Sequence, residues 1–371
     1  MSVDMSLSLE EALASANQAL EDGEFVDALG FVKQALALAP QDADALELKG
    51  LALAELGEFE EADDAFAALL KVDPKHVTGL IAAADLKIRE PGDDRERIEE
   101  GLALLRRAEA AAKQAATGKA RTAAEMEREE RAQEAAAIEL ELLRGIAMNQ
   151  LGDLEAALAA FGRVLALDPD HSEAQLERAL GVFEQGRFEE AKKAFEKLTR
   201  DYPEDPWSFH YLGLIAERRG DDAESWFEKA RKLDPEEFTA PTRLSIAEFD
   251  AAVADAIDKL PEHAKAELGN VIIKVEPFPS DEEIREGSSP IILGVFIGAG
   301  LTERLHMHAG HSADGGMGME ETARIILFQK NLERFARSRE ELLEEIRITV
   351  LHEVGHLLGL DEDELYERGL D

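Results

Sequence analysis

The stretches GEFVDALGFVKQALALAP, residues 23–40, and GEFEEADDAFAALLKVDP, residues 57–74, repeat one pattern with a period of 34 residues. Four pairs of positions keep this spacing: Gly23 and Gly57, Phe25 and Phe59, Ala28 and Ala62, and Pro40 and Pro74. In such a pattern Gly ends the first helix of a pair, the small Ala allows close packing, and Pro stops the second helix. Each copy is therefore predicted to form a helical hairpin.

The same pattern returns further along the chain. The later copies are marked by Gly152, Ala157, Phe161 and Pro169, by Gly186, Ala191, Phe195 and Pro203, and, in a shortened form, by Gly220, Ala223, Phe227 and Pro235. From Pro74 to Pro169 there are 95 residues, whereas two periods need 68, so a third repeat is predicted to carry 27 extra residues. This helical extension, around residues 100–137, is interpreted as an elongated pair of solvent-facing helices, with a special binding arm as the alternative.

These repeats resemble the tetratricopeptide repeat (TPR) family over roughly residues 8–238. The resemblance implies a right-handed superhelix of helical hairpins whose concave groove binds a peptide or a partner protein. Some family members hold carboxylate tails with Lys and Arg. The acidic balance of this chain argues against that clamp, so the expected partner of the groove is basic or apolar.

Acidic residues dominate the composition, with 80 Asp and Glu against 41 Lys and Arg and a formal charge of -39. Such a chain repels nucleic-acid phosphates and anionic lipid, so neither nucleic acid nor membrane is expected as a partner. The sequence has no cysteine, which excludes thiolate metal ligands and a Cys nucleophile. The N-terminus does not read as a signal peptide, and the longest apolar run, residues 291–301, is too short to span a bilayer, so a cytoplasmic location is expected.

The period of 34 stops after Pro241, and residues 241–371 are predicted to form a small α+β domain. A helix is expected around residues 246–260, with its apolar face at Phe249, Val253, Ile257 and Leu260. Three β-like runs follow, NVIIKVEPF (270–278), PIILGVFIG (290–298) and ARIILFQKN (323–331).

The last long helix is expected to begin at Ser338, which with Glu341 has the spacing of a capping box. Apolar residues recur at steps of three and four along this helix, at Leu343, Ile346, Val350, Val354 and Leu357. We expect this face to be buried. Gly359 is a natural stop for the helix.

The segment HEVGH, residues 352–356, places two imidazoles one helical turn apart on a second side of the same helix. Both rings can direct a nitrogen at one Zn²⁺ ion, and Glu353 can reach a water on that ion as the general base of amide hydrolysis. The predicted metal ligands are therefore His352 and His356, and the predicted catalytic residue is Glu353. The alternative is a pair of surface histidines on a terminal helix.

A third ligand is expected from the acidic segment after Gly359. In the HExxHxxGxxH pattern the glycine turns the chain so that the residue six beyond the second His meets the metal, which here is Glu362. Asp361 is the adjacent alternative, and Glu364 and Glu367 are weaker candidates. The choice between Glu362 and Asp361 stays open.

The segments LPEHAKAELGNVIIKVEPFPS, ILGVFIGAGLTER, ARIILFQKNLERFA and VLHEVGHLLGLDEDELYERGL resemble the minimal zincin family of bacterial metallopeptidases, over roughly residues 245–370. The resemblance implies a zinc domain with HExxHxxGxxD-type ligands, and His352, Glu353 and His356 carry over directly. The family usually has Asp where this chain has Glu362. The predicted fold class is thus an all-α TPR superhelix followed by a small α+β zincin-like domain.

Residues 304–321, RLHMHAGHSADGGMGMEE, depart most from that family. His306, His308 and His311 are candidates for a second metal site or for holding an oxyanion, and the alternative is a flexible loop at the cleft. Arg304 and Tyr366 are further candidates for an electrophile.

Two functions fit these observations. The first is a zinc metallopeptidase whose repeats recruit a substrate or a regulator. The second is a TPR scaffold or adaptor protein with a structural or inactive zinc-binding domain. An open coordination position on the metal favours catalysis, whereas saturation by the two histidines together with Asp361 and Glu362 favours a structural site.

Overall fold

A computed structural model describes residues 7–89, 94–115, 122–298 and 323–366. The chain divides into two compact units, Met1–Gly181 and Val182–Asp371. The His- and Met-rich segment 304–321 lies outside the described residues, and so do Arg304 and Glu367.

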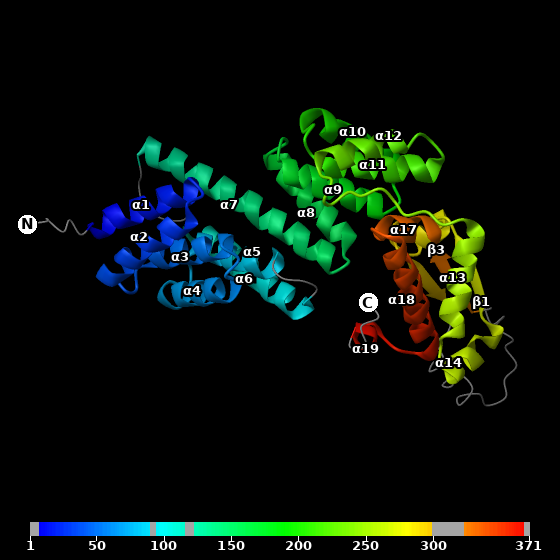
Figure 1. The fold of residues 1–371 in the computed structure, drawn as a ribbon. Coiled ribbons are helices and arrows are strands. Elements are labelled where there is room, and N and C mark those ends of the chain that lie inside the picture. The colour runs from blue at the N-terminus through cyan, green and yellow to red at the C-terminus, as the bar shows by residue number, and fades with distance from the viewer. Residues whose placement is uncertain (1–6, 90–93, 116–121, 299–322, 367–371) are drawn as a thin grey trace, which may run out of the picture. The chain divides into compact units, whose positions relative to one another are not determined.

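The first unit consists of helices that pack in hairpin pairs (Figure 1). They are α1 (Leu9–Glu21), α2 (Phe25–Leu38), α3 (Ala43–Glu55), α4 (Phe59–Val72), α5 (Val77–Arg89), α6 (Arg95–Ala115), α7 (Ala123–Gln150) and α8 (Leu154–Leu167), followed by α9 (Ser172–Glu184). The segment predicted as a helical extension contains most of α6, with 21 residues, and the first half of α7, with 28.

Close packing within the hairpins depends on small residues. A Cβ atom at Gly50 would stand 2.4 Å from the ring of Phe66, and one at Gly145 would stand 2.4 Å from the ring of Phe161. Both rings are fully buried, so each glycine lets a phenylalanine of the second helix lie against the backbone of the first. Gly57, after α3, has a φ of 76°, the left-handed conformation that ends a helix and that glycine adopts without strain.

The second unit begins with the last helices of the array and continues into a small α+β fold. Its elements are α10 (Phe188–Asp201), α11 (Pro206–Arg219), α12 (Glu224–Leu233), α13 (Ile246–Asp258), α14 (Glu262–Glu267), η1 (Leu268–Asn270), β1 (Ile272–Glu276), α15 (Asp281–Arg285), β2 (Gly294–Ile297), β3 (Arg324–Phe328), α17 (Gln329–Phe335), α18 (Arg339–Leu358) and α19 (Glu362–Tyr366).

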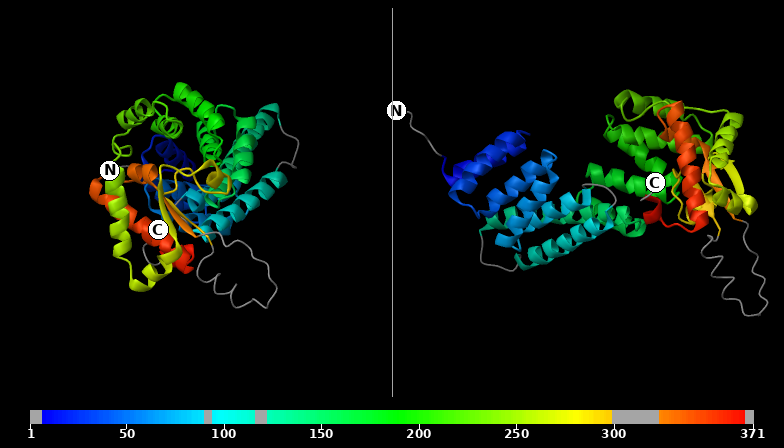
Figure 2. Two further views of the ribbon diagram at one scale, coloured as in Figure 1. Left: turned by 90° about the vertical axis from the view of Figure 1, so that its right-hand side faces the viewer. Right: turned by 60° about the horizontal axis from the view of Figure 1, so that its bottom comes forward.

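The three predicted β-like runs form one sheet with the order β1-β3-β2. β3 is central, parallel to β1 and antiparallel to β2, with Val275 opposite Leu327 and Phe296 opposite Ile325. Helices α13 and α18 lie together over one face of this sheet (Figure 2). Their apolar residues meet those of β3 in one core, which includes Phe249, Ile325 and Ile346.

Two details of α18 differ from the sequence prediction. Leu343 is 41% exposed, and the buried face starts at Leu342, because Leu342 is one full turn before the buried Ile346. Ser338 caps the helix by accepting the N–H of Glu341, at 3.1 Å. The Glu341 carboxylate accepts the N–H of Arg337 at 2.8 Å rather than that of Ser338, so the capping box is only half formed.

The hairpin of α11 and α12 packs directly on the small fold within the second unit. The guanidinium of Arg334, in α17, lies 2.6 Å from the carboxylate of Glu217 and 3.6 Å from the ring centroid of Phe227. Arg218 donates to the carbonyl oxygen of Pro279 and pairs with Asp281, at 2.6 and 2.8 Å. These contacts bury Arg218 of the hairpin against the small fold and Arg334 of the small fold against the hairpin.

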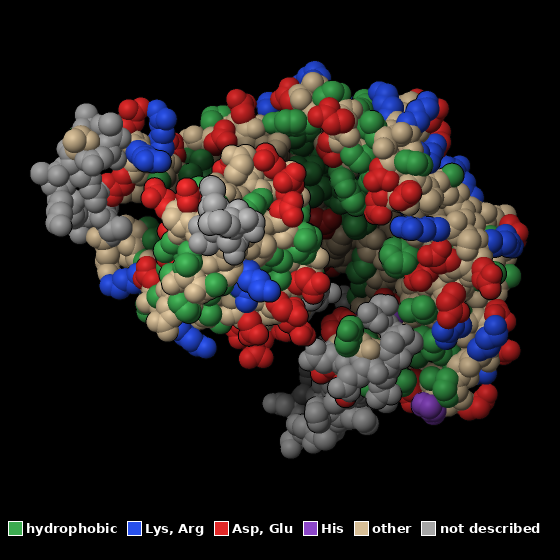
Figure 3. All heavy atoms as spheres, turned by 60° about the vertical axis from the view of Figure 1, so that its left-hand side comes forward, with side chains coloured by type: hydrophobic (Ala, Val, Ile, Leu, Met, Phe, Trp, Pro, Cys, Tyr) green, Lys and Arg blue, Asp and Glu red, His purple; other side chains and the backbone are tan. Residues whose placement is uncertain are grey.

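Acidic side chains are spread over the face of the molecule shown in Figure 3, with Lys and Arg between them. Most ion pairs lie at the surface, where each stabilises the fold little. Among the described residues, no helix combines the length and the apolar character needed to cross a membrane.

Candidate metal centre

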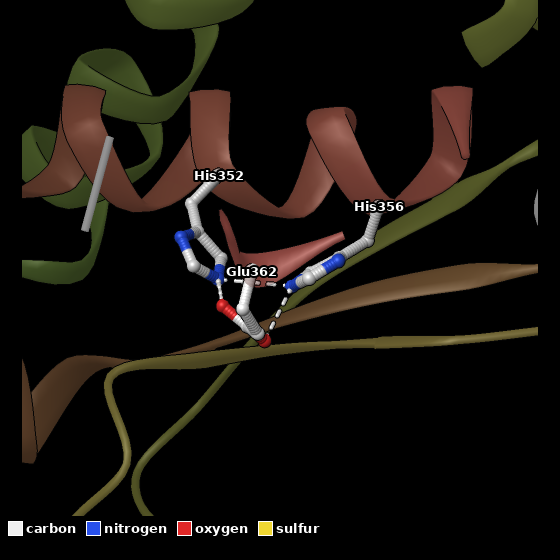
Figure 4. A group of neighbouring side chains, drawn as sticks. All are labelled: His352, His356 and Glu362. Carbon is white, nitrogen blue, oxygen red and sulfur yellow. Dashed lines mark hydrogen bonds and ion pairs between the residues drawn. The ribbon is translucent and has the colours of Figure 1, made fainter. Parts of the chain in front are cut away.

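His352 and His356 project from the same side of α18 towards Glu362 at the start of α19 (Figure 4). The two Nε2 atoms lie 3.0 Å apart. The carboxylate of Glu362 lies 3.7 Å from Nε2 of His352 and 3.3 Å from Nε2 of His356. The helical spacing of four residues brings the rings together edge-to-face, with centroids 4.6 Å apart and an angle of 81° between the planes, and the turn after α18 returns the carboxylate to them.

These separations fit a single metal ion. Tetrahedral zinc with bonds of about 2.0–2.1 Å keeps its ligand atoms roughly 3.3 Å apart. The two Nε2 atoms are 3.0 Å apart, and the two oxygens of Glu362 lie 3.3 and 3.7 Å from one Nε2 atom each, which is close to this value. One ligand atom from each of the three residues lies within 4.8 Å of the others. His352, His356 and Glu362 therefore form a group that could hold a metal.

The turn after α18 also fixes the orientation of one ring. Gly359 has a φ of 88°, and the next residue, Leu360, places its carbonyl oxygen 3.2 Å from Nδ1 of His356. A carbonyl oxygen only accepts, so Nδ1 carries the proton and donates it. The lone pair of Nε2 is then free to bind a cation, as is usual for histidine ligands held by a second hydrogen bond.

Glu353 lies beside this group and is buried, with 5% exposure. Burial raises the pKa of its carboxyl group to about 8, the N–H of Phe296 lowers the pKa by donating to the carboxylate, and the negative charge of Glu362 raises it again. A divalent cation at the neighbouring group would favour the carboxylate form.

The edge strand β2 forms the wall opposite α18. Gly294 allows this approach, since a Cβ there would stand 2.7 Å from Cγ2 of Thr349 and 3.0 Å from Oε1 of Glu353. A cavity of about 640 Å³ lies between the strand and the helix, and its walls include Val295, Phe296, His352, Glu353, His356 and Glu362. The group that could hold a metal, the buried carboxyl group and a strand edge that pairs with no other described strand therefore share one cavity.

Comparison with family models matches residues 268–370 to the zincin-like metallopeptidases. Two models of the tetratricopeptide repeat match residues 19–84 with 149–207, and residues 179–238. The chain carries tetratricopeptide repeats followed by a zincin-like metallopeptidase domain. The predicted fold class is confirmed.

Two solved structures show similarity to this chain. PilW, described as a widely conserved type IV pilus biogenesis factor, is 16% identical, with a TM-score of 0.51 over 62% of this chain and 94% of PilW. The pilF protein of Pseudomonas aeruginosa is 17% identical, with a TM-score of 0.48 over 66% of this chain and 96% of its own. At these identities the likeness to PilW concerns the fold alone.

The other predicted site residues that the structure describes are not part of the three-residue group, although Asp361 lines the same cavity as the two histidines. The carboxylate of Asp361 accepts the N–H of Glu364 at 2.9 Å and so caps α19. Glu364 is exposed, and its carboxylate accepts the N–H of Asp361 in return. Tyr366 is 71% exposed. The candidates His306, His308, His311, Arg304 and Glu367 fall outside the part of the chain that the structure describes.

Three contributors to the zincin-like site had no signal in the sequence motif. Two are backbone groups, the N–H of Phe296 and the carbonyl of Leu360. Which backbone groups face the site depends on contacts between distant segments, and the motif does not specify these contacts. The third is the buried Asn331, whose side chain donates to the carbonyl oxygens of Pro290 and Ile292 at 3.1 and 2.7 Å. Asn331 thereby anchors the turn that leads into β2.

Proposed function

We propose that the protein is a zinc-dependent metallopeptidase that hydrolyses peptide bonds, with His352, His356 and Glu362 as metal ligands and Glu353 as the general base. The observation that carries this proposal is the shared cavity. It joins a three-residue group with the separations of a zinc site to a buried carboxyl group of raised pKa. Clusters of this kind are typical of catalytic centres.

A zinc ion held there would supply a Lewis acid for the substrate carbonyl and for the attacking water. The carboxylate of Glu353 takes the proton of that water on one of its oxygens and passes it to the leaving nitrogen. The N–H of Phe296 orients this carboxylate, and the carbonyl of Leu360 selects the neutral tautomer of His356 whose lone pair is on Nε2. The buried position of Glu353 limits competing water and strengthens these interactions.

The edge strand supports a peptide as the substrate. Among the residues that the structure describes, β2 pairs with β3 on one side only, and its other side faces the cavity through Gly294, Val295 and Phe296. A strand edge offers backbone groups to an extended chain, which adds as a further strand. In this arrangement the scissile bond of the peptide would lie next to Glu353.

The tetratricopeptide repeats are proposed to recruit a substrate or partner protein, as such repeats generally bind proteins or peptides. In the first unit, a hollow of about 870 Å³ is lined by apolar residues that include Leu51, Phe66 and Ile81. The same lining contains the acidic residues Glu47, Glu55, Asp85 and Glu139. The one cation of this lining, Arg89, is paired with Asp85 and Glu173, each at 2.6 Å. A segment with apolar and basic side chains complements this surface.

The alternative function is a scaffold or adaptor protein with a structural or inactive metal site. A structural zinc site uses four protein ligands, whereas a catalytic site uses three and keeps one position open. Among the described residues the candidate group has three members, and Asp361 caps α19 instead of joining them. A group of three protein ligands therefore favours the peptidase over the scaffold with a structural site.

The test combines metal analysis with a peptidase assay on a mixed peptide library. Glu353→Gln should keep about one zinc per chain and lose cleavage, while His352→Ala should lose both. Glu340→Gln, an exposed change on the same helix α18, is the matched control and should keep both properties. Undiminished cleavage by Glu353→Gln would remove the assigned base, and zinc without any cleavage in the unaltered protein would favour the scaffold.

A further inference from the structure

The carboxylate of Glu362 is held towards the histidine pair by the backbone that carries it and not by packing of its own side chain. The Glu362 side chain is 76% exposed, whereas the side chains of His352 and His356 are 23% and 24% exposed. An exposed side chain of this length loses rotamer freedom when it is fixed. Glu362 is also the first residue of α19, which has five residues, and a helix this short is not stable in water by itself. The position of the carboxylate therefore depends on what docks α19.

Leu365 is the apolar residue that docks α19. Its side chain is 0% exposed, whereas Glu364 and Tyr366 on the same helix are exposed. Glu362 and Leu365 are three residues apart, so both lie on one side of the helix. The side of α19 that turns towards α18 thus carries a buried leucine and the proposed metal ligand.

Gly355 forms the surface on which Leu365 packs. In the sequence it lies between His352 and His356, and it is buried. A Cβ atom at Gly355 would stand 2.3 Å from Cδ2 of Leu365, well inside the roughly 3.5–4.0 Å of a normal contact between carbon atoms. The side chain of Leu365 therefore occupies the space that a side chain at position 355 would need. Glycine is unfavourable inside a helix, and this contact gives a reason for a glycine between the two histidines.

The backbone connects this contact to the carboxylate over a few residues. The N–H of Leu360 donates to the carbonyl oxygen of Gly355 at 3.0 Å and closes the turn after α18. The N–H of Leu365 donates to the carbonyl oxygen of Asp361, also at 3.0 Å, in the first turn of α19. Glu362 is thus fixed on one side by the turn and on the other side by the buried leucine.

We propose that Leu365 is a positioning residue of the metal centre. Its side chain packs against Gly355 and so holds the carboxylate of Glu362 beside the two imidazoles. The inference rests on the proposed function, since it takes Glu362 as a ligand of the zinc ion. A ligand that is held in place loses little freedom on binding, so the contact raises the affinity for the metal. Leu365 is apolar and acts only through Glu362.

A leucine that only stabilises the fold has a different signature. Its loss lowers the stability of the domain whether or not residue 362 is a glutamate. A positioning residue loses its effect on the metal once the ligand that it positions has been removed. The two roles are therefore separated by a double-mutant cycle between positions 362 and 365, with the zinc affinity as the measured quantity.

The dissociation constant of zinc is measured on the full-length chain by competition with a chelator. Leu365→Ala should weaken zinc binding by roughly 10–100-fold, the effect typical of residues that orient a ligand. Glu362→Ala should weaken it by more. The double variant should bind zinc as Glu362→Ala does, because the position of a missing carboxylate has no effect on the ion.

Two variants control for the loss of packing, and circular dichroism establishes which variants are folded during the titration. Leu342→Ala removes an equally buried leucine, with 0% exposure, from α18. It lies ten residues before His352, or about 15 Å away along the helix, so it should keep the zinc affinity. Leu365→Met retains most of the side-chain volume and should keep the zinc affinity as well.

Gly355→Ala tests the same contact from the other helix and decides the question if Leu365→Ala does not fold. Alanine is favourable in a helix, but its methyl group would displace the side chain of Leu365. Gly355→Ala should therefore weaken zinc binding in a chain that has Glu362 and should have no effect on zinc in a chain that carries Glu362→Ala.

The inference is overturned if a folded Leu365→Ala chain keeps the zinc affinity of the unaltered chain. Where that variant does not fold, the same result in Gly355→Ala overturns it. An equal loss of affinity with and without Glu362, or a loss no larger than that of Leu342→Ala, overturns it too. Failure of the proposed function has another pattern, in which Glu362→Ala itself keeps the affinity or the unaltered chain binds no zinc. Either result also removes the ligand that Leu365 would position.

Discussion

Gly294 lies against Glu353 so closely that a Cβ atom at Gly294 would stand 3.0 Å from Oε1 of the glutamate. The same atom would stand 2.7 Å from Cγ2 of Thr349, which is buried in α18. A methyl group therefore has no room unless the strand or the carboxyl group moves. The position of the proposed base depends on a residue that has no side chain.

Gly294→Ala is expected to lower kcat by about 10 to 100-fold, because a displacement of about 1 Å in a catalytic group has an effect of this size. Zinc content should not change, since the substitution is on β2 and the ligands are on α18 and α19. The control is Gly269→Ala, where an added Cβ meets nothing within 4 Å. An unchanged kcat in Gly294→Ala would show that the contact does not position the base.

A comparison of Glu362→Ala with Asp361→Ala decides the third ligand. Glu362→Ala should weaken zinc binding by more than the roughly 10–100-fold typical of residues that only orient ligands. Asp361→Ala should keep the metal and lose only the cap of α19, which is worth about 1 kcal/mol. Competitive titration with a chelator measures both. The reverse order of affinities would assign the metal to Asp361.

Local patterns predicted the parts of this structure that local geometry determines. A spacing of four residues places His352 and His356 on one side of any helix, and the glycine at the turn position of each hairpin, such as Gly57, ends a helix in the left-handed conformation. Steps of three and four did not distinguish Leu342 from Leu343, because both positions continue an apolar face at this spacing. The order of the strands and the contact of Gly294 with Glu353 depend on pairing between distant segments, which no local pattern encodes.

Asn331 should control the position of β2 through its two hydrogen bonds to the turn before it. Asn331→Ala leaves the buried carbonyl oxygen of Pro290 and the partly buried one of Ile292 without these donors. An unsatisfied buried group costs about 1–3 kcal/mol, so Pro290 should contribute most of the effect. Hydrogen exchange should then become faster at residues 290–297 than in α13. Exchange that rises equally in β2 and α13 would indicate general destabilisation and no specific anchoring.

The stability of the second unit should fall in mild acid because of His210. The pKa of this residue in the folded protein is about 4, lowered by burial and by Arg334, and the ordinary value is 6.5. Between these values the unfolded chain binds the proton and the folded chain does not, so stability is complete above pH 6.5 and is lost as the pH falls towards 4. At pH 5 the loss is about 2 kcal/mol relative to pH 7.5.

This acid sensitivity can be separated from that of the many carboxylates by a double comparison. Chemical unfolding of the wild-type chain and of His210→Gln at pH 7.5 and pH 5 gives four free energies, and only the difference of differences belongs to His210. The glutamine variant should lose about 2 kcal/mol less than the wild type on acidification, even if it is less stable at both pH values. Equal losses would mean that His210 is protonated in the folded state at pH 5. Its neighbours Phe238 and Arg334 would then tolerate a charge that burial and like-charge repulsion are expected to oppose.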